Sequence, residues 1–152
     1  MPYFVCGWVE SNFETPLERG STTTWEPLLS LGPFNIGGDE VSDYLFGLAK
    51  QPRADAPFAE RGVPVDCSDV IRNEVERNKR FVKEHGEGNF GYTHATLGEV
   101  LWALSATDAP QPSEVLGGAW KAVLEAVTFL SSRTHADRIP PEQLRFIVWA
   151  NW

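Results

Sequence analysis

The chain has 152 residues, 42% of them hydrophobic and 22% charged, which is the composition of a globular domain and excludes a disordered tail. Its formal net charge of −8 argues against binding to nucleic acid, although a basic protein partner is compatible with it. A chain of this length is expected to form one domain, residues 1–152, whose core needs no disulfide or metal to fold.

The sequence also bears on the compartment. Cys6 and Cys67 are too few and too far apart for a disulfide framework, so reduced thiols are expected. The N-terminal residues lack the basic and apolar regions of a secretory signal. No apolar run approaches the roughly 20 residues of a membrane-spanning helix. These features predict a cytoplasmic protein that does not contact a membrane.

The first predicted elements are two strands and a short helix. Residues 3–10 carry aromatic and β-branched side chains on both faces, which is typical of a buried strand. Residues 25–31 predict a second strand, which Pro27 restricts to a sheet edge or a strand start. Residues 41–48 have apolar side chains at helical spacing. The prolines that follow predict an irregular loop over 50–65.

Three more helices are predicted further along the chain. Residues 66–84 have the pattern of an amphipathic helix that is capped by Asp66 or Ser68. Residues 97–106 predict a shorter helix. Residues 113–133 predict a longer one, with a continuous apolar stripe that faces the core.

The end of the chain completes the predicted sheet. Residues 144–152 return to strand composition and are expected to pair with residues 3–10. Residues 86–96 are expected to form a second irregular segment. Strands at both ends and helices between them predict an α+β fold, in which a small, mainly antiparallel sheet includes both termini. We expect three to four helices to pack on one face of this sheet.

A histidine lies just ahead of one predicted helix, in the stretch GYTHATLGE. Thr96 and Glu99 have the spacing of a capping box, so both are interpreted as a helix start. His94 lacks such an explanation. Together His94 and Thr96 resemble the His-x-Thr element of two-histidine phosphoesterases, which need two such elements. Neither His85 nor His135 is followed by a matching Ser or Thr, so the second element is missing.

Other catalytic and cofactor motifs are absent from the sequence. The three histidines show no helical pairing and no Cys-x-x-Cys accompanies them, so no metal site is predicted. Phosphate-binding loops, dinucleotide fingerprints and nucleophile elbows do not occur, and no cofactor is predicted. Cys67 lies near a helix start, which lowers the pKa of a thiol, but Asp66 and Asp69 oppose this effect and predict an inert thiol.

The loop ahead of residues 66–84 is the strongest candidate for a binding site. Gly62 and Pro64 restrict the backbone around Arg61, and a fixed arginine beside the free amides of a helix start suits an anion. Alternatively, Arg61 binds backbone carbonyls or Asp43 and only pins the loop.

Four motifs, spread over most of the chain, are Asp43-Tyr44, Arg61-Gly62-x-Pro64-x-Asp66-x-Ser68, Thr93-His94-x-Thr96-Leu97 and Arg145-Phe146-x-Val148-Trp149. In this combination the chain resembles a loose set of uncharacterised proteins from bacteriophages and actinobacteria. The resemblance implies a phage or bacterial setting, and hence the cytoplasm of a host bacterium, but it implies no activity.

These observations lead to one main hypothesis and two alternatives. The main hypothesis is a non-enzymatic binding protein, an accessory of a phage or bacterial conflict system, which holds a small anionic, nucleotide-like ligand. Arg61 would contact the anion, His94 and Tyr44 would orient it, and Asp66 would hold the loop. One alternative is an acidic inhibitor or immunity-type protein that binds a basic partner protein. The other is a small hydrolase that uses His94.

Overall fold

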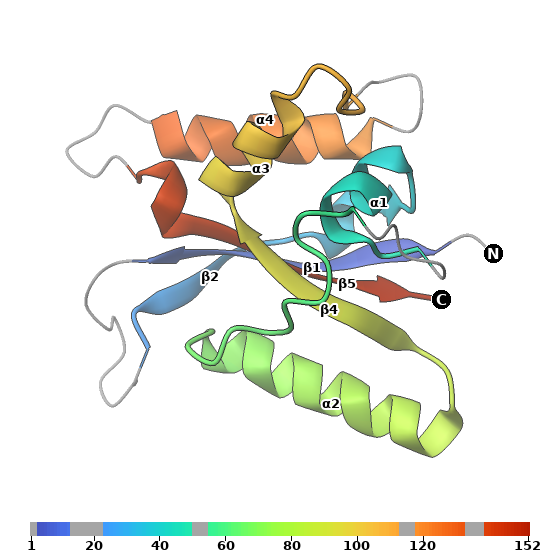
Figure 1. Cartoon of the computed structure of the whole chain (residues 1–152). Helices are drawn as coiled ribbons and strands as arrows, with labels where there is room; N and C mark the ends of the chain where they lie inside the picture. The colour runs from blue at the N-terminus through green and yellow to red at the C-terminus, as the bar shows by residue number, and fades with distance from the viewer. Residues whose placement is uncertain (1–2, 13–22, 50–54, 113–117, 133–138) are drawn as a thin grey trace.

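The computed structural model describes residues 3–12, 23–49, 55–112, 118–132 and 139–152. An antiparallel sheet lies at its centre (Figure 1). In this sheet β1 (Phe4–Asn12) lies between β2 (Trp25–Ser30) and β5 (Leu144–Asn151), and β4 (Asn89–Thr96) forms the far edge beside β5. A short strand, β3 (Ile36–Gly37), pairs with the start of β1. The predicted α+β fold, with strands from both ends of the chain in one sheet, is confirmed.

The two terminal strands pair along almost their whole length. Phe4 lies opposite Asn151 at one end of the register, and Ser11 lies opposite Leu144 at the other, as the prediction for residues 3–10 and 144–152 requires. The strand β2 is the outermost strand of the sheet, so the edge position inferred from Pro27 is also confirmed.

Helices cover both faces of the sheet. The helices α1 (Glu40–Phe46), α3 (Leu97–Leu104) and α4 (Ala119–Ser132) lie on one side, and α2 (Asp69–His85) lies on the other (Figure 1). Short 3₁₀ turns, η1 (Gly32–Phe34) and η2 (Pro141–Gln143), precede β3 and β5. The expectation that all helices pack on one face is therefore wrong. The physical reason lies in β5, which is buried at seven successive positions and so needs cover on both sides.

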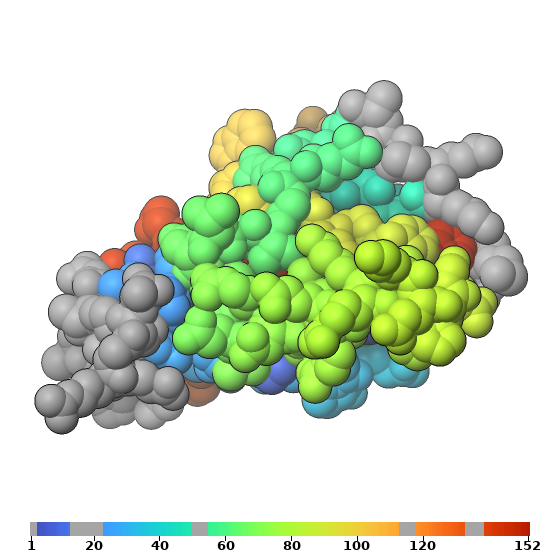
Figure 2. Space-filling model, turned by 90° about the horizontal axis from the view of Figure 1, so that it is seen from below, coloured from blue at the N-terminus to red at the C-terminus, as the bar shows by residue number. Residues whose placement is uncertain are grey.

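Each face has its own apolar core. On the first side, Trp120 of α4 stacks with Phe46 of α1 and meets Phe146 of β5 edge-on. On the second side, Ile71 and Val75 of α2 pack in a smaller cluster with residues of β5. Figure 2, which views the molecule from below, shows α2 lying across this second face.

No helix in the described part of the chain is long and apolar enough to cross a membrane.

One predicted segment has the wrong structure. Residues 86–96 were expected to be irregular, but Asn89–Thr96 is the edge strand β4. Its pairing with β5 shifts between Phe90 and Thr93, and this irregularity interrupts the period of two by which a strand is recognised. The described part of the 50–65 loop, by contrast, contains only turns and extended chain, as predicted.

Helix boundaries differ from the predicted ones by a few residues. The second helix has Ser68 rather than Asp66 at its N-cap, although the Ser68 side chain makes no capping hydrogen bond. The last helix is observed from Ala119 to Ser132, and residues 113–117 and 133 of its predicted span lie outside the described residues.

Candidate functional site

Residues 55–68, in the loop between α1 and α2, run along the outer edge of β4 and pass from one face of the sheet to the other (Figure 1). The Gly62 amide donates to the Tyr92 carbonyl oxygen at 3.1 Å, and the Arg61 amide donates to Thr93 Oγ1 at 3.3 Å. The Thr93 hydroxyl in turn donates to the Phe58 carbonyl. The two segments singled out in the sequence therefore meet, and these bonds hold the loop against the edge strand.

Arg61 is already paired within the chain. Its Nη1 lies 2.6 Å from Glu99 Oε2 and 3.5 Å from the His94 carbonyl oxygen, while its guanidinium carbon lies 4.7 Å from the centre of the Phe58 ring. Asp43, the alternative partner considered from the sequence, instead accepts a hydrogen bond from the Tyr3 hydroxyl. The charge of Arg61 is thus matched by a carboxylate that the sequence assigned only to a helix cap.

Glu99 has two roles at once. The predicted capping box is confirmed, since the Glu99 amide donates to Thr96 Oγ1 at 3.1 Å and the Thr96 amide donates to Glu99 Oε1 at 3.2 Å. The second carboxylate oxygen binds Arg61. Partial burial works to raise the pKa of the Glu99 carboxyl, but the hydrogen bonds from Arg61 and Thr96 outweigh burial and hold that pKa below its ordinary value. Glu99 therefore joins the start of α3 to the loop.

His94 has a defined tautomer. Its Nδ1 lies 2.9 Å from the Gly62 carbonyl oxygen, and because a carbonyl can only accept, Nδ1 must carry a proton. The neighbouring threonines bond to other groups, since the Thr93 hydroxyl donates to the Phe58 carbonyl and Thr96 Oγ1 accepts the Glu99 amide. In the neutral ring, Nε2 is then an acceptor. His94 lies opposite Ile147, so its side chain is on the α2 face of the sheet.

The other two predicted residues are Tyr44, on α1, and Asp66, at the end of the loop ahead of α2. The Tyr44 hydroxyl donates to the Ala103 carbonyl oxygen at 3.2 Å, which ties α1 to α3. Asp66 Oδ1 lies 2.9 Å from Arg145 Nη1 and ties the loop to β5. Of the four predicted ligand-binding residues, the structure brings only Arg61 and His94 together, and their contact runs through the His94 main chain.

The anion expected at the start of α2 is supplied by the chain itself. The Glu10 carboxylate, which is fully buried, accepts the Ser68 amide at 2.7 Å and pairs with Arg145 Nε at 2.7 Å. The Arg145 guanidinium also lies 3.8 Å from the centre of the Trp25 ring. The predicted chemistry of an arginine and helix amides around an anion is thus present, but with Arg145 in place of Arg61.

Neither Glu10 nor Arg145 was predicted to have a role at this position, although the sequence contains a signal for it. Both occupy positions at which the period of two in their strands points a side chain to the α2 face, among apolar residues such as Trp8 and Ile147. Two opposite charges at inward positions of two strands that were predicted to pair indicate a buried ion pair.

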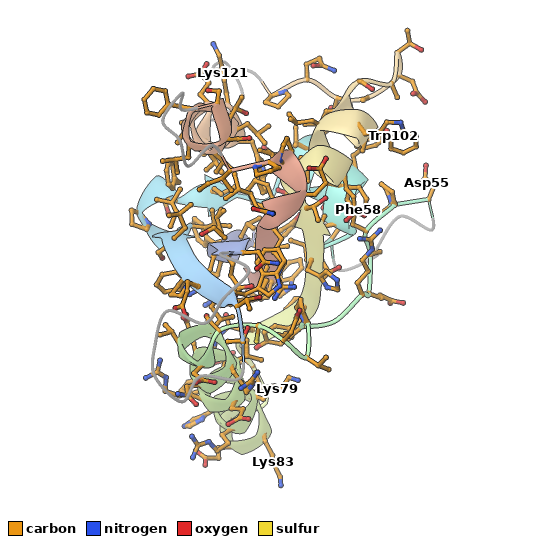
Figure 3. All side chains as sticks on the ribbon, turned by 90° about the vertical axis from the view of Figure 1, so that its left-hand side faces the viewer. Asp55, Phe58, Lys79, Lys83, Trp102 and Lys121 are labelled. Carbon is orange, nitrogen blue, oxygen red and sulfur yellow. The ribbon has the colours of Figure 1, made fainter. Side chains whose placement is uncertain are left out.

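A hollow of about 510 Å³ opens between the loop and α3. We call six of its lining residues the Trp102 surface, namely Phe58, Arg61, Gly98, Glu99, Trp102 and Glu142. Trp102 is 75% exposed at this surface. Figure 3 shows Trp102 and Asp55 projecting from the same side of the molecule, with Phe58 set further in. An adjoining hollow of about 280 Å³ includes Tyr44 and Asp55 and shares Trp102.

The described residues hold no group of three or more His, Cys, Asp or Glu side chains that is arranged to bind a metal. Cys6 and Cys67 are free thiols. Burial raises the pKa of both thiols, and the neighbouring carboxylates of Glu74 and Glu10 act in the same direction. A protonated thiol is a poor nucleophile, and Cys67 is also buried, in agreement with the inert role predicted for it.

Comparison with known proteins adds no relative, since the chain matches no protein-family model, no curated protein and no solved structure.

Proposed function

We propose that this is a non-enzymatic binding protein that holds a basic protein partner on the Trp102 surface. The observation that carries the proposal is Trp102 itself, a large aromatic side chain that is 75% exposed at the rim of a hollow. Tryptophan and arginine are the residues that most often dominate the binding energy of protein interfaces, and they do so next to concave, partly apolar surfaces.

The charge of the surface supports a basic partner. The charge of Arg61 is balanced by Glu99. The exposed carboxylate of Glu142 has no ion pair among the described residues, so it adds a net negative charge to the surface. The whole chain carries a formal charge of −8. Such a charge speeds the encounter with a positively charged protein and disfavours an acidic one.

The small anionic ligand stays a prediction, with less support from the geometry. Among the described residues, Arg61 is the only cation that lines the hollow, and its Nη1 already lies 2.6 Å from a carboxylate. An incoming anion would have to displace Glu99, which would lose both an ion pair and part of the capping of α3.

The hydrolase alternative rests on the tautomer of His94. A histidine whose Nδ1 is bound to a carbonyl presents Nε2 as a proton acceptor, which is the form that a general base requires. Within the described residues, however, Gly62 is the one hydrogen-bond partner of the ring, and no nucleophile or second proton carrier is hydrogen-bonded to it.

Capture from bacterial lysate tests the proposed function. The wild-type protein is immobilised beside Trp102→Ala and Phe129→Ala, because Phe129 is a matched aromatic residue, 64% exposed, on the outer face of α4. We expect one basic protein to be retained by the wild type and by Phe129→Ala but not by Trp102→Ala. Retention should weaken as salt rises from about 50 mM to about 500 mM, because screening shortens the reach of charge.

Two results would contradict the proposal. Equal retention by wild type and Trp102→Ala would remove the surface from the binding function. Release of a nucleotide or another small anion from the purified protein, with loss of that anion in Arg61→Ala, would favour the anionic-ligand hypothesis instead.

A further inference from the structure

We infer that the group recognised on the Trp102 surface is a guanidinium, supplied by an arginine of the basic partner, which stacks on the Trp102 ring and pairs with the Glu142 carboxylate. This inference rests on the proposed function, and it names the chemistry that the surface selects.

The chain binds its own arginines in this manner at two places. Arg61 lies over the Phe58 ring at 4.7 Å and pairs with Glu99 at 2.6 Å. Arg145 lies over the Trp25 ring at 3.8 Å and pairs with Glu10 at 2.7 Å. In both places one arginine combines an aromatic face with a carboxylate, which satisfies the flat guanidinium face and its N–H edge together.

Trp102 and Glu142 form a third set of the same kind, in which the arginine is missing from the described residues. Gly98 and Trp102 are four residues apart on α3, so they lie on the same face of the helix. Helical side chains lean towards the N-terminus, which brings the Trp102 side chain over the turn that contains Gly98. A β-carbon at Gly98 would lie 3.6 Å from Glu142 Oε1. Since Gly98 has no side chain, nothing from that position separates the indole from the carboxylate.

The arrangement favours arginine over lysine. A guanidinium is planar, stacks on an indole and can present two parallel N–H groups to one carboxylate. An ammonium is compact and strongly hydrated, so it gains less from an exposed ring. The neighbouring Arg61 does not repel the incoming group strongly, because Glu99 balances its charge.

Short peptides test this inference directly. Tetra-arginine, tetra-lysine and tetra-citrulline peptides are titrated into ¹⁵N-labelled protein. NMR follows the indole Nε1–H signal of Trp102 and, for every variant including Trp102→Ala, the backbone amide signals of α3. Citrulline keeps the planar shape of arginine but lacks its charge. We expect the arginine peptide to bind at least about threefold more tightly than the lysine peptide, and the citrulline peptide to bind least.

Three variants separate the parts of the site. Trp102→Ala should abolish the arginine preference, and Glu142→Gln should weaken binding of the arginine peptide by about two- to fivefold, the range of an exposed ion pair. Gly98→Leu should block binding while leaving both recognition groups in place, because its side chain fills the space beside Glu142. The matched controls on α4, Phe129→Ala and Glu125→Gln, should bind like the wild type, with the indole signal of Trp102 unchanged in free protein.

The outcomes distinguish this inference from the proposed function. Equal binding of arginine and citrulline peptides, or wild-type affinity in Glu142→Gln, would overturn the guanidinium site. If the lysate partner is still captured through Trp102 in that case, the proposed function stands and only the recognised group is different. If Trp102→Ala affects neither the peptides nor the captured partner, both proposals fail.

Discussion

At Gly7 the backbones of β1 and β5 leave no room for a side chain. A β-carbon there would lie 2.0 Å from the Ile147 carbonyl oxygen, and the residue has a φ of +140°. We expect Gly7→Ala to lower the free energy of unfolding by about 3 kcal/mol or more, since the obstacle is backbone on the adjacent strand. Gly62→Ala is the matched control, with a φ of +75° but nothing within 4 Å, and should cost about 1–2 kcal/mol. Similar urea midpoints for the two variants would contradict the packing argument.

The buried pair of Glu10 and Arg145 makes a second prediction for single residues. Arg145→Met should lower the free energy of unfolding by about 3–5 kcal/mol, because it leaves the Glu10 carboxylate, 0% exposed, without its cation. Adding Glu10→Gln should recover part of this loss, since a neutral amide is less costly to bury and can still accept the Ser68 amide. Urea denaturation of both variants measures the effect, and a double variant less stable than Arg145→Met would show that the charge is not its cause.

Glu99 belongs to the capping box of α3 and also pairs with Arg61 of the loop. The stability of the protein should therefore depend on the ionisation of Glu99. The pKa of this carboxyl is lowered in the folded protein, so its contribution to stability is fully present above the ordinary pKa of about 4.3 and is lost as the pH falls through the lower folded value. Glu99→Gln should therefore be less stable than wild type at about pH 7, by about 1 kcal/mol or less given the exposure of the pair. The difference should close at acid pH, and a constant difference across the titration would exclude the ionised carboxylate as its source.

Gly98 offers the opposite kind of change within the same helix. A β-carbon at this position would make only ordinary contacts, at 3.6 Å or more, with Glu142, Pro141 and Thr96. Gly98→Ala should stabilise the protein by about 0.5–1 kcal/mol, because alanine loses less conformational entropy than glycine in a helix. Thermal unfolding measures this change, and a lower midpoint would mean that the turn beside Glu142 is more crowded than the contacts indicate.

The elements differ in how much of them the sequence reveals. The strands β1 and β5 have continuous apolar runs, and α2 and α4 have clear stripes, so local pattern is sufficient for them. The helix α3 is apolar on several sides, with Val100 buried and Leu101 and Trp102 exposed, so its pattern predicts a helix but not which aromatic residue faces solvent. The strand β4 was missed because its polar residues make contacts with a loop far away in sequence. Such contacts form only in the folded chain, so a local sequence pattern does not reveal them.

The candidate site shows the same division between local and distant information. The capping box of Thr96 and Glu99 depends on four consecutive residues and was predicted correctly. The partner of Arg61 was not, because Glu99 lies 38 residues away and reaches the loop only when β4 has joined the sheet. The Trp102 surface draws on the loop, α3 and η2, three segments that only the complete sheet brings together.

For the whole molecule, β5 is the strand on which the sheet depends. It pairs with β1 on one side and with β4 on the other, and no pairing joins those two strands directly among the described residues. Removing residues 144–152 would leave β4 without a neighbour in the sheet. It would also leave β1 with β2 and β3 alone, and a sheet of so few strands is marginal without the packing of a helix on it.

We expect the chain shortened to residues 1–143 to lose its cooperative fold. The deleted strand carries five large apolar side chains that are at most 1% exposed, namely Leu144, Phe146, Ile147, Val148 and Trp149. Each is worth about 1.5–3 kcal/mol when buried, against a total stability of about 5–15 kcal/mol for a domain. Circular dichroism should show no cooperative melting. A synthetic peptide of residues 144–152 should restore it, because both cores and both strand pairings depend on that segment. Cooperative melting of the shortened chain without the peptide would contradict this prediction. It would mean that the helices stabilise the remaining strands in the absence of β5.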